Sequence, residues 1–185
     1  MEVKTARKEL EILQYPHPYL ETESEPIDFL SRDLILLSQN MVHTMEAANG
    51  IGLSANQIGV LKRMFVMKII SNNQEDPQYL IAINPLIIEN TEEMDSLEGC
   101  LSFNYIESLV PVKRSNKIVM SYSDLNGEYK AVELTGINAI CAQHEIDHLN
   151  GITFVDRTTE EKRTELIELA SINLFGDENG TETND

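Results

Sequence analysis

The chain of 185 residues carries 14 Lys and Arg side chains against 31 Asp and Glu side chains, so its formal net charge is −17 at pH 7. Such a charge disfavours partners that present phosphate groups, and we expect neither a nucleic acid nor an anionic membrane surface among its partners. Hydrophobic residues make up 42% of the chain, which is enough for one globular domain with a buried core.

No apolar run in the sequence is long enough to span a membrane, and the charged segment Met1–Leu10 does not have the pattern of a signal peptide. We therefore expect a cytoplasmic protein, in which Cys100 and Cys141 remain reduced. Residues 1–176 are predicted to form a single catalytic domain. The acidic residues 177–185 are predicted to be a disordered tail.

The first half of the chain predicts one helix followed by strands. Residues 1–23 are expected to be extended, and a helix is predicted from Pro26 to about Ala48 because apolar residues recur there at helical spacing. Residues 61–70 and 79–88 are rich in strand-forming residues. Pro85 in the second of these segments predicts either an edge strand or a bulge.

The second half predicts an antiparallel hairpin and two more helices. Residues 110–134 have a β pattern with a turn signal at Asp124–Gly127, and Gly136 precedes a helix. Residues 152–155 are predicted to be a short strand or extended segment. A last helix is predicted between Thr158 and Gly176, with a capping box from Thr158 to Glu161. Its predicted apolar face consists of Leu166, Leu169, Ala170 and Leu174.

The segment Gly50–Gly59 is rich in small residues but does not match a nucleotide-binding loop. Ala55 stands where a dinucleotide-binding loop needs its third glycine, and no Gly-Lys-Ser/Thr sequence follows. Glycines in such a segment allow backbone groups to approach a bound ligand closely. Gln57 is then placed to donate a hydrogen bond to that ligand.

The strongest chemical signal is the His-Glu-x-x-His sequence formed by His144, Glu145 and His148. On a helix the two imidazoles share one face and can bind one metal ion, while Glu145 can take a proton from a water on that ion. The alternative is a solvated helix with two histidines four residues apart. Apolar residues before His144 favour a buried helix. From spacing alone, either Cys100 or Cys141 can supply the third ligand.

Three segments together closely resemble the peptide deformylase family: Gly50–Gln57, Glu98–Ser102 and Gln143–Gly151, in this order. The resemblance implies an α+β fold in which a central metal-binding helix packs among antiparallel β-sheets, with a helix in the N-terminal half and a C-terminal helix. It implies that Cys100 is the third metal ligand. It further implies that Glu145 is the general acid/base.

The same resemblance implies a cofactor, a substrate and the groups that bind it. The cofactor is one divalent metal ion, Fe²⁺ in most members, with Zn²⁺, Ni²⁺ or Co²⁺ as substitutes. The substrate is the N-formyl-methionyl end of a new polypeptide, from which formate is released. Gln57 and the backbone N–H of Leu101 are expected to stabilise the oxyanion. Substrate contacts are expected from Gly50, Ile51, Gly52, Gly99, Ile140 and Cys141.

Two other functions compete with deformylation. A His-Glu-x-x-His metallopeptidase would cut another amide bond. Such enzymes usually take His, Glu or Asp as the third ligand, so the Cys100 segment disfavours a metallopeptidase function. A purely structural role would use the metal, or a disulfide between Cys100 and Cys141, only to stabilise the fold.

The chain departs from the family pattern at several positions. Ser54 stands where alanine is usual, and residues 103–105 (Phe-Asn-Tyr) replace an apolar residue followed by Pro-Gly, which leaves the shape of the pocket rim open. Some bacterial members dock on ribosomes through a basic C-terminal helix. Here residues 158–185 carry two basic and eight acidic side chains, so we do not expect ribosome docking.

Overall fold

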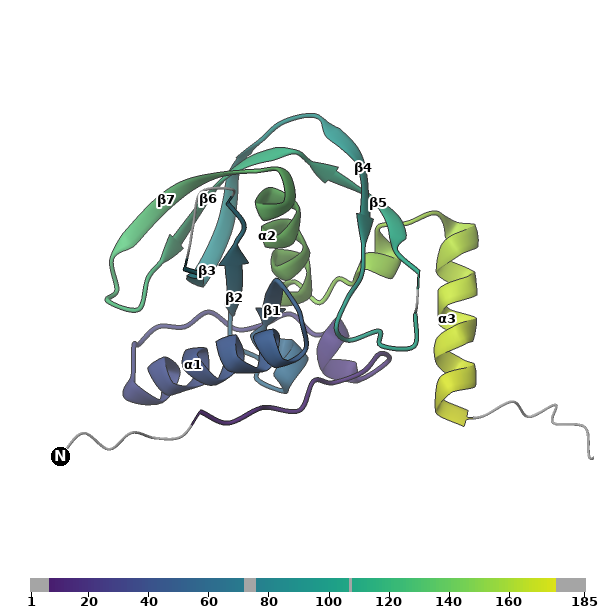
Figure 1. Ribbon diagram of the computed structural model, residues 1–185, viewed down its shortest axis with the longest axis horizontal. Coiled ribbons are helices and arrows are strands. Elements are labelled where there is room, and N and C mark those ends of the chain that lie inside the picture. Colours follow the sequence, from purple (N-terminus) through teal and green to yellow (C-terminus); the bar gives the residue numbers. More distant parts are fainter. Residues whose placement is uncertain (1–6, 72–75, 107, 176–185) are drawn as a thin grey trace, which may run out of the picture.

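The computed structural model describes residues 7–71, 76–106 and 108–175, and these residues form an α+β fold, as predicted (Figure 1). The helices of this part of the chain are α1 (Arg32–Ala47), α2 (Gly136–Leu149) and α3 (Glu160–Phe175), with short 3-10 turns η1 (Pro18–Glu21), η2 (Ala55–Ile58) and η3 (Phe154–Asp156). The strands are β1 (Gly52–Ser54), β2 (Met64–Ile69), β3 (Gln78–Asn90), β4 (Glu93–Glu98), β5 (Val110–Ser115), β6 (Lys117–Ser123) and β7 (Tyr129–Thr135).

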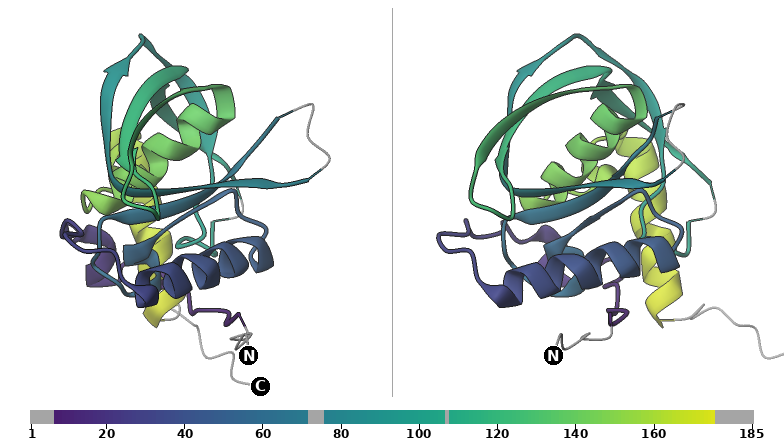
Figure 2. Two further views of the ribbon diagram at one scale, coloured as in Figure 1. Left: turned by 90° about the vertical axis from the view of Figure 1, so that its left-hand side faces the viewer. Right: turned by 60° about the vertical axis from the view of Figure 1, so that its left-hand side comes forward.

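Within the described residues the strands form two separate antiparallel sheets. The larger has the order β1-β2-β3-β6-β7, and β4 and β5 form a two-stranded ribbon. The register between β3 and β6 shifts on either side of Leu86 and Ile87. Such irregularities bend a sheet, and Figure 2 shows the larger sheet curving around α2. Pro85 lies at the first shift, so the predicted bulge is confirmed.

Helices cover both faces of the larger sheet, which explains why β2 is apolar without alternation. Phe65 and Met67 pack in the same cluster as residues of α2, whereas Met64 and Val66 pack with residues of α1. Helix α2 therefore lies against the concave face of the sheet and is buried along most of its length. The apolar residues before His144 predicted this burial correctly.

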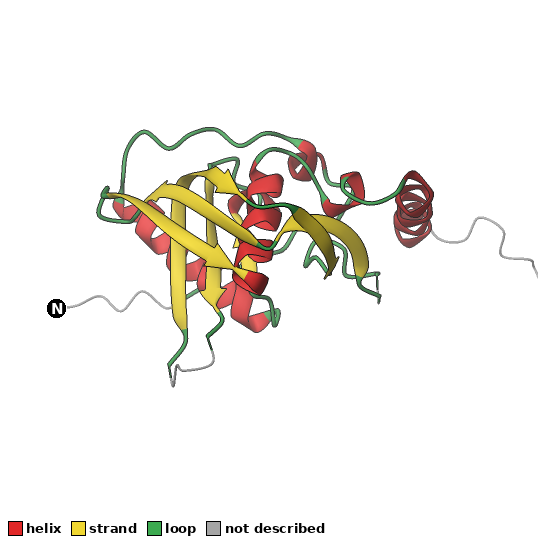
Figure 3. Cartoon of the chain, turned by 90° about the horizontal axis from the view of Figure 1, so that it is seen from above, coloured by secondary structure: helices red, strands yellow, loops and turns green. Residues whose placement is uncertain are grey.

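Helix α3 stands at one end of the molecule, beyond the ribbon (Figure 3). It buries Leu166 and Ala170 in a cluster with Phe103 and Phe154. Leu169 was predicted to share this apolar face, but its side chain is 40% exposed, so that prediction is wrong. The side chain of Leu174 lies outside the described residues.

Two helices begin at other residues than predicted, because local hydrogen bonds cap them there. Helix α1 begins at Arg32, not Pro26, because the Ser31 hydroxyl accepts a hydrogen bond from the Leu34 N–H at 3.2 Å. Thr159, not Thr158, caps α3, since its hydroxyl accepts from the Lys162 N–H at 3.3 Å.

Three short elements also differ from the predictions. Residues 152–155 lead into the 3-10 turn η3 instead of forming a strand, since the Asp156 carboxylate accepts from both the N–H and the hydroxyl of Thr153. The extended N-terminal segment includes η1. Residues 89–95, for which no strand was predicted, are exposed and include the end of β3 and the start of β4.

Two further predictions concern the chain as a whole. The predicted acidic tail, residues 177–185, and the domain end at residue 176 lie outside the described residues. Among the described helices, none combines the length and apolar character needed to cross a membrane.

The end of α2 provides a test of the fold. Gly151 has φ +70°, and a Cβ there would lie 2.8 Å from the backbone carbonyl of Glu21. Gly136, at the other end of α2, has φ +56° but open space around a Cβ. We expect Gly136→Ala to lower the free energy of unfolding by about 1 kcal/mol from backbone strain alone. Gly151→Ala should lower it by clearly more, because its Cβ would also meet the Glu21 backbone. Equal losses of unfolding free energy for the two variants, measured by urea denaturation, would show that this close contact has no effect on stability.

Candidate metal centre

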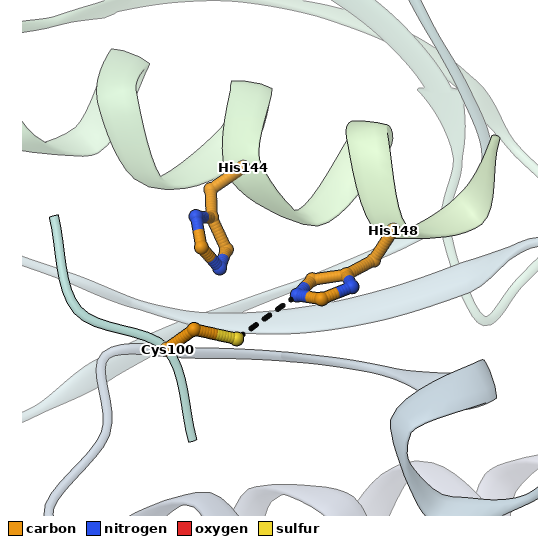
Figure 4. A group of neighbouring side chains, drawn as sticks. All are labelled: Cys100, His144 and His148. Carbon is orange, nitrogen blue, oxygen red and sulfur yellow. Dashed lines mark hydrogen bonds between the residues drawn. The ribbon is translucent and has the colours of Figure 1, made fainter. Parts of the chain in front are cut away.

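Helix α2 places His144 and His148 one turn apart on the same side, with ring centroids 4.9 Å apart. The Cys100 Sγ, in the segment after β4, lies 3.2 Å from the His148 Nε2. One atom from each of these three side chains lies within 4.8 Å of the other two. Figure 4 shows the two rings directed toward the sulfur. The structure thus brings together the three residues predicted as metal ligands.

The donor set fits a divalent cation. Zn–S and Zn–N bonds of about 2.3 and 2.0 Å place tetrahedral ligand atoms roughly 3.3–3.8 Å apart. The 3.2 Å between the Cys100 Sγ and the His148 Nε2 is close to this range, and all three ligand atoms lie within 4.8 Å of one another. Three protein ligands also leave a fourth position for water or substrate, as a catalytic site requires. Cys141, the other possible ligand, instead donates from its thiol to the Ile51 carbonyl at 3.5 Å. Burial raises the pKa of this thiol well above its ordinary value.

Glu145 lies on α2 between the two histidines and is buried, with 3% of its surface exposed. Its Oε2 atom has no hydrogen-bond partner among the described residues. Burial raises the pKa of this carboxyl to about 7. A buried carboxylate with a free oxygen is suited to accept and return a proton. Gly52 leaves the space beside it, since a Cβ at residue 52 would lie 2.3 Å from the Glu145 Oε1.

The side-chain amide of Gln57, in η2, has a defined orientation. Its oxygen accepts hydrogen bonds from the N–H and the hydroxyl of Ser54, at 2.9 and 2.8 Å. Its nitrogen donates to the Ser102 hydroxyl at 3.1 Å and points to the Cys100 Sγ at 3.7 Å. The N–H and the hydroxyl of Ser54 therefore hold the oxygen end of the Gln57 amide, and its donor end faces Cys100.

A cleft of about 610 Å³ opens over these groups. Cys100, His144, Glu145 and Gln57 line it, whereas His148 is not part of the lining and is only 1% exposed. The remaining residues predicted for the site also line the cleft, namely Gly50, Ile51, Gly52, Gly99, Leu101, Ile140 and Cys141. The predicted site residues other than His148 thus share one cavity.

Phe103 and Asn104, which also line the cleft, are held by contacts with other parts of the chain. Phe103 is buried, with its ring stacked on Tyr15 at 4.8 Å and against the edge of Phe154 at 4.6 Å. Asn104 is exposed, and its N–H donates to the Gln14 side chain at 3.0 Å. The loop is therefore held by an aromatic cluster and by the N-terminal segment.

The charged residues behind the candidate metal ligands were not predicted from the sequence. The Glu98 carboxylate lies 2.8 Å from the His144 Nδ1, the ring nitrogen that faces away from Cys100, and Arg114 binds the same carboxylate through two hydrogen bonds. Burial alone would raise the pKa of Glu98, but the hydrogen bonds from His144 and Arg114 lower it to about 2. Carboxylates in this position orient ligating histidines. The position of Glu98, two residues before Cys100, was the signal in the sequence that could have indicated this role.

Comparison with known proteins identifies the family. The model of the polypeptide deformylase family matches residues 9–164. The peptide deformylase of Thermodesulfovibrio yellowstonii is 40% identical over 154 residues, covering 83% of this chain and 92% of that protein.

Solved structures of peptide deformylases have the same fold. The enzyme from Ehrlichia chaffeensis superposes with a TM-score of 0.82 at 32% identity, covering 90% of this chain and 98% of that one. The enzyme from Acinetobacter baumannii, solved with Met-Ala-Ser bound, has a TM-score of 0.72 at 30% identity, covering 82% of this chain and 99% of that one. The family match, the sequence identity and the shared fold agree, and the chain belongs to the polypeptide deformylase family.

Proposed function

We propose that this cleft hydrolyses the formyl amide of N-formyl-methionyl peptides through a division of labour among six residues. As a family member, the chain is an enzyme that removes N-terminal formyl groups. The proposed assignment of its residues rests on one observation: Glu145, a buried carboxyl group with a free oxygen, lines the same cleft as Cys100 and His144, which lie close to His148. The six residues are Cys100, His144, His148, Glu145, Gln57 and Leu101.

Cys100, His144 and His148 would hold the divalent cation. A bound cation supplies a Lewis acid that lowers the pKa of a water molecule in its open position. Thiolate and imidazole ligands suit iron, zinc, nickel and cobalt, and among these we propose Fe²⁺ as the native metal. Glu98, hydrogen-bonded to His144, keeps that ring turned toward the cation.

Glu145 moves the proton. Its free Oε2 accepts a proton from the attacking water as the oxygen bonds to the formyl carbon. When the C–N bond breaks, Glu145 returns this proton to the leaving amine. The products are formate and a peptide with a free methionine N-terminus.

Gln57 and Leu101 stabilise the charge that develops on the formyl oxygen. The Gln57 Nε2 already faces the metal ligands, because Ser54 holds the opposite end of the amide. The N–H of Leu101, the residue after Cys100, is the second proposed donor. One such donor typically contributes on the order of 10²–10³ in rate.

The peptide would lie along β1. This strand forms an edge of the larger sheet, so an extended substrate can add to it beside Gly50 and Gly52. Ile51, Ile140 and Cys141 would contact the methionine side chain. The Met-Ala-Ser bound by the Acinetobacter baumannii relative is a peptide of the kind that deformylation yields. We propose no ribosome docking through α3, whose described charges are mainly acidic.

Formate release from formyl-Met-Ala by anaerobically purified protein tests this function. We expect Glu145→Gln to lower kcat by on the order of 10²–10⁴, because glutamine cannot accept the proton. Metal content and melting temperature serve as controls and should stay at the wild-type values. Unchanged turnover would overturn the role of Glu145, and cleavage of the Met–Ala bond would favour the metallopeptidase alternative.

Gly52→Ala tests the space beside the catalytic carboxylate. The added methyl group would lie 2.3 Å from the Glu145 Oε1 and 2.7 Å from the Cys141 Sγ, so one or both side chains must shift. We expect a fall in kcat of about tenfold to 10²-fold, since small displacements of catalytic groups have large effects. Gly136→Ala, whose added Cβ has no neighbour within 4 Å, is the matched control and should retain wild-type kcat. Equal kcat values for both variants would show that the space beside Glu145 is not needed for catalysis.

Removal of the metal tests the ligand set. Protein stripped by a chelator should release no formate, and Fe²⁺, Zn²⁺, Ni²⁺ or Co²⁺ added separately should each restore activity, Fe²⁺ the most. The metal should also raise the melting temperature, because it binds only the folded chain. Full activity of metal-free protein would rule out the proposed centre, and a higher rate with another cation would correct the choice of iron.

A further inference from the structure

A continuous chain of ion pairs connects His144 to the protein surface. It starts at the His144 Nδ1, which lies 2.8 Å from the Glu98 Oε2. Arg114 donates to both oxygens of Glu98, at 2.8 and 3.1 Å, and its third nitrogen donates to the Asp147 Oδ2. Arg157 then binds both oxygens of Asp147, at 2.9 and 2.6 Å. Every link is a charge-assisted hydrogen bond, and two of the links are paired.

The chain of ion pairs crosses three separate parts of the fold. Glu98 and Arg114 belong to the ribbon of β4 and β5, and His144 and Asp147 belong to α2. Arg157 follows η3, in the connection to α3. The ribbon also carries Cys100, two residues beyond Glu98. The same contacts therefore relate the cysteine ligand to the helix that carries both histidine ligands.

Arg157 is the outermost residue in this series of ion pairs. The side chains of Glu98, Arg114 and Asp147 are nearly buried, at 4–7% exposure, whereas that of Arg157 is 44% exposed. The two carboxylates and two guanidiniums balance in charge only when Arg157 is included. Without it, Asp147 keeps one arginine, shared with Glu98, and a buried negative charge is left uncompensated. Arg114 would then be drawn toward Asp147 and away from Glu98.

We propose that Arg157 is a positioning residue for the metal centre, acting through Asp147, Arg114 and Glu98 on the orientation of His144. Arg157 itself does not line the cleft, so it touches neither the substrate nor the reacting atoms. The proposal rests on the proposed role of His144 as a ligand. Formate release by the wild-type holoenzyme tests the proposed function separately, and the loss of activity on metal removal tests the ligand set.

A neighbouring arginine provides a matched control. Arg163 lies in α3 and pairs with Asp156 at 3.5 Å, and its side chain is 39% exposed, similar to that of Arg157. Neither Arg163 nor Asp156 joins the chain of ion pairs that leads to His144 within the described residues. A general loss of surface charge pairing should therefore affect variants of both arginines, whereas positioning should appear only at Arg157.

The test uses Co²⁺ as the probe, bound to full-length protein from which the metal has been removed. We expect Arg157→Gln to weaken Co²⁺ binding by about tenfold, the lower end of the range for residues that orient ligands. The ligand-field absorption bands of the bound Co²⁺ should also shift, and kcat should fall more than KM changes. We expect the values for Arg157→Lys to lie between those for the wild type and those for Arg157→Gln, since lysine keeps the charge but cannot make the paired contact. Arg163→Gln should match the wild type in all these measurements.

An effect on stability alone would contradict the proposal. If Arg157→Gln lowers only the melting temperature while Co²⁺ affinity and absorption match those of Arg163→Gln, Arg157 is a structural residue and the proposal is wrong. If Arg157→Gln does not fold, Arg157→Lys decides by the same two Co²⁺ measurements.

Discussion

The candidate metal site depends on the attachment of the ribbon, which leads to Cys100, to helix α2, which carries His144 and His148. Among the described residues the ribbon pairs with no strand of the larger sheet, so no ladder of backbone hydrogen bonds joins the two. Arg114 makes the attachment by reaching from β5 to Asp147 on α2 while also binding Glu98. Buried charges are stable only when fully paired, so these groups tolerate few other arrangements. Gln143 adds a second attachment through two hydrogen bonds to the backbone of Ser115.

Features that depend on neighbouring residues could be predicted from the sequence. The histidine pair on a buried helix follows from a four-residue spacing and the apolar residues before it. The hairpin of β6 and β7 follows from the turn at Asp124–Gly127, where the Asp124 side chain accepts from two backbone N–H groups. The bulge at Pro85 follows from the missing N–H of proline. In each case the cause and the structure lie within a few residues of one another.

Features that depend on distant residues could not be predicted in this way. The residues alone left Cys100 and Cys141 as equal candidates for the third ligand, and only the family resemblance separated them. In the structure the Cys141 thiol turns to the Ile51 carbonyl, a contact across 90 positions of the chain. Glu98 and Asp147 were missed for the same reason, because their arginine partner lies on another element. Strand β4 was missed because its first three residues, which include Glu93 and Asp95, are exposed and do not show an alternating pattern, and its pairing partner β5 lies further along the chain.

The same long-range constraint extends to Gln57, the proposed oxyanion donor. Asn56, next to Gln57, is fully buried, and its amide nitrogen donates to the backbone carbonyl of His148. The Ser54 hydroxyl lies within hydrogen-bond distance of both Asn56 and Gln57. The turn that orients the Gln57 amide is therefore hydrogen-bonded to His148, a proposed metal ligand. Catalytic groups gain most when they are oriented before the reaction begins. The buried polar side chains around this cleft hold the donor and the ligands in one fixed arrangement.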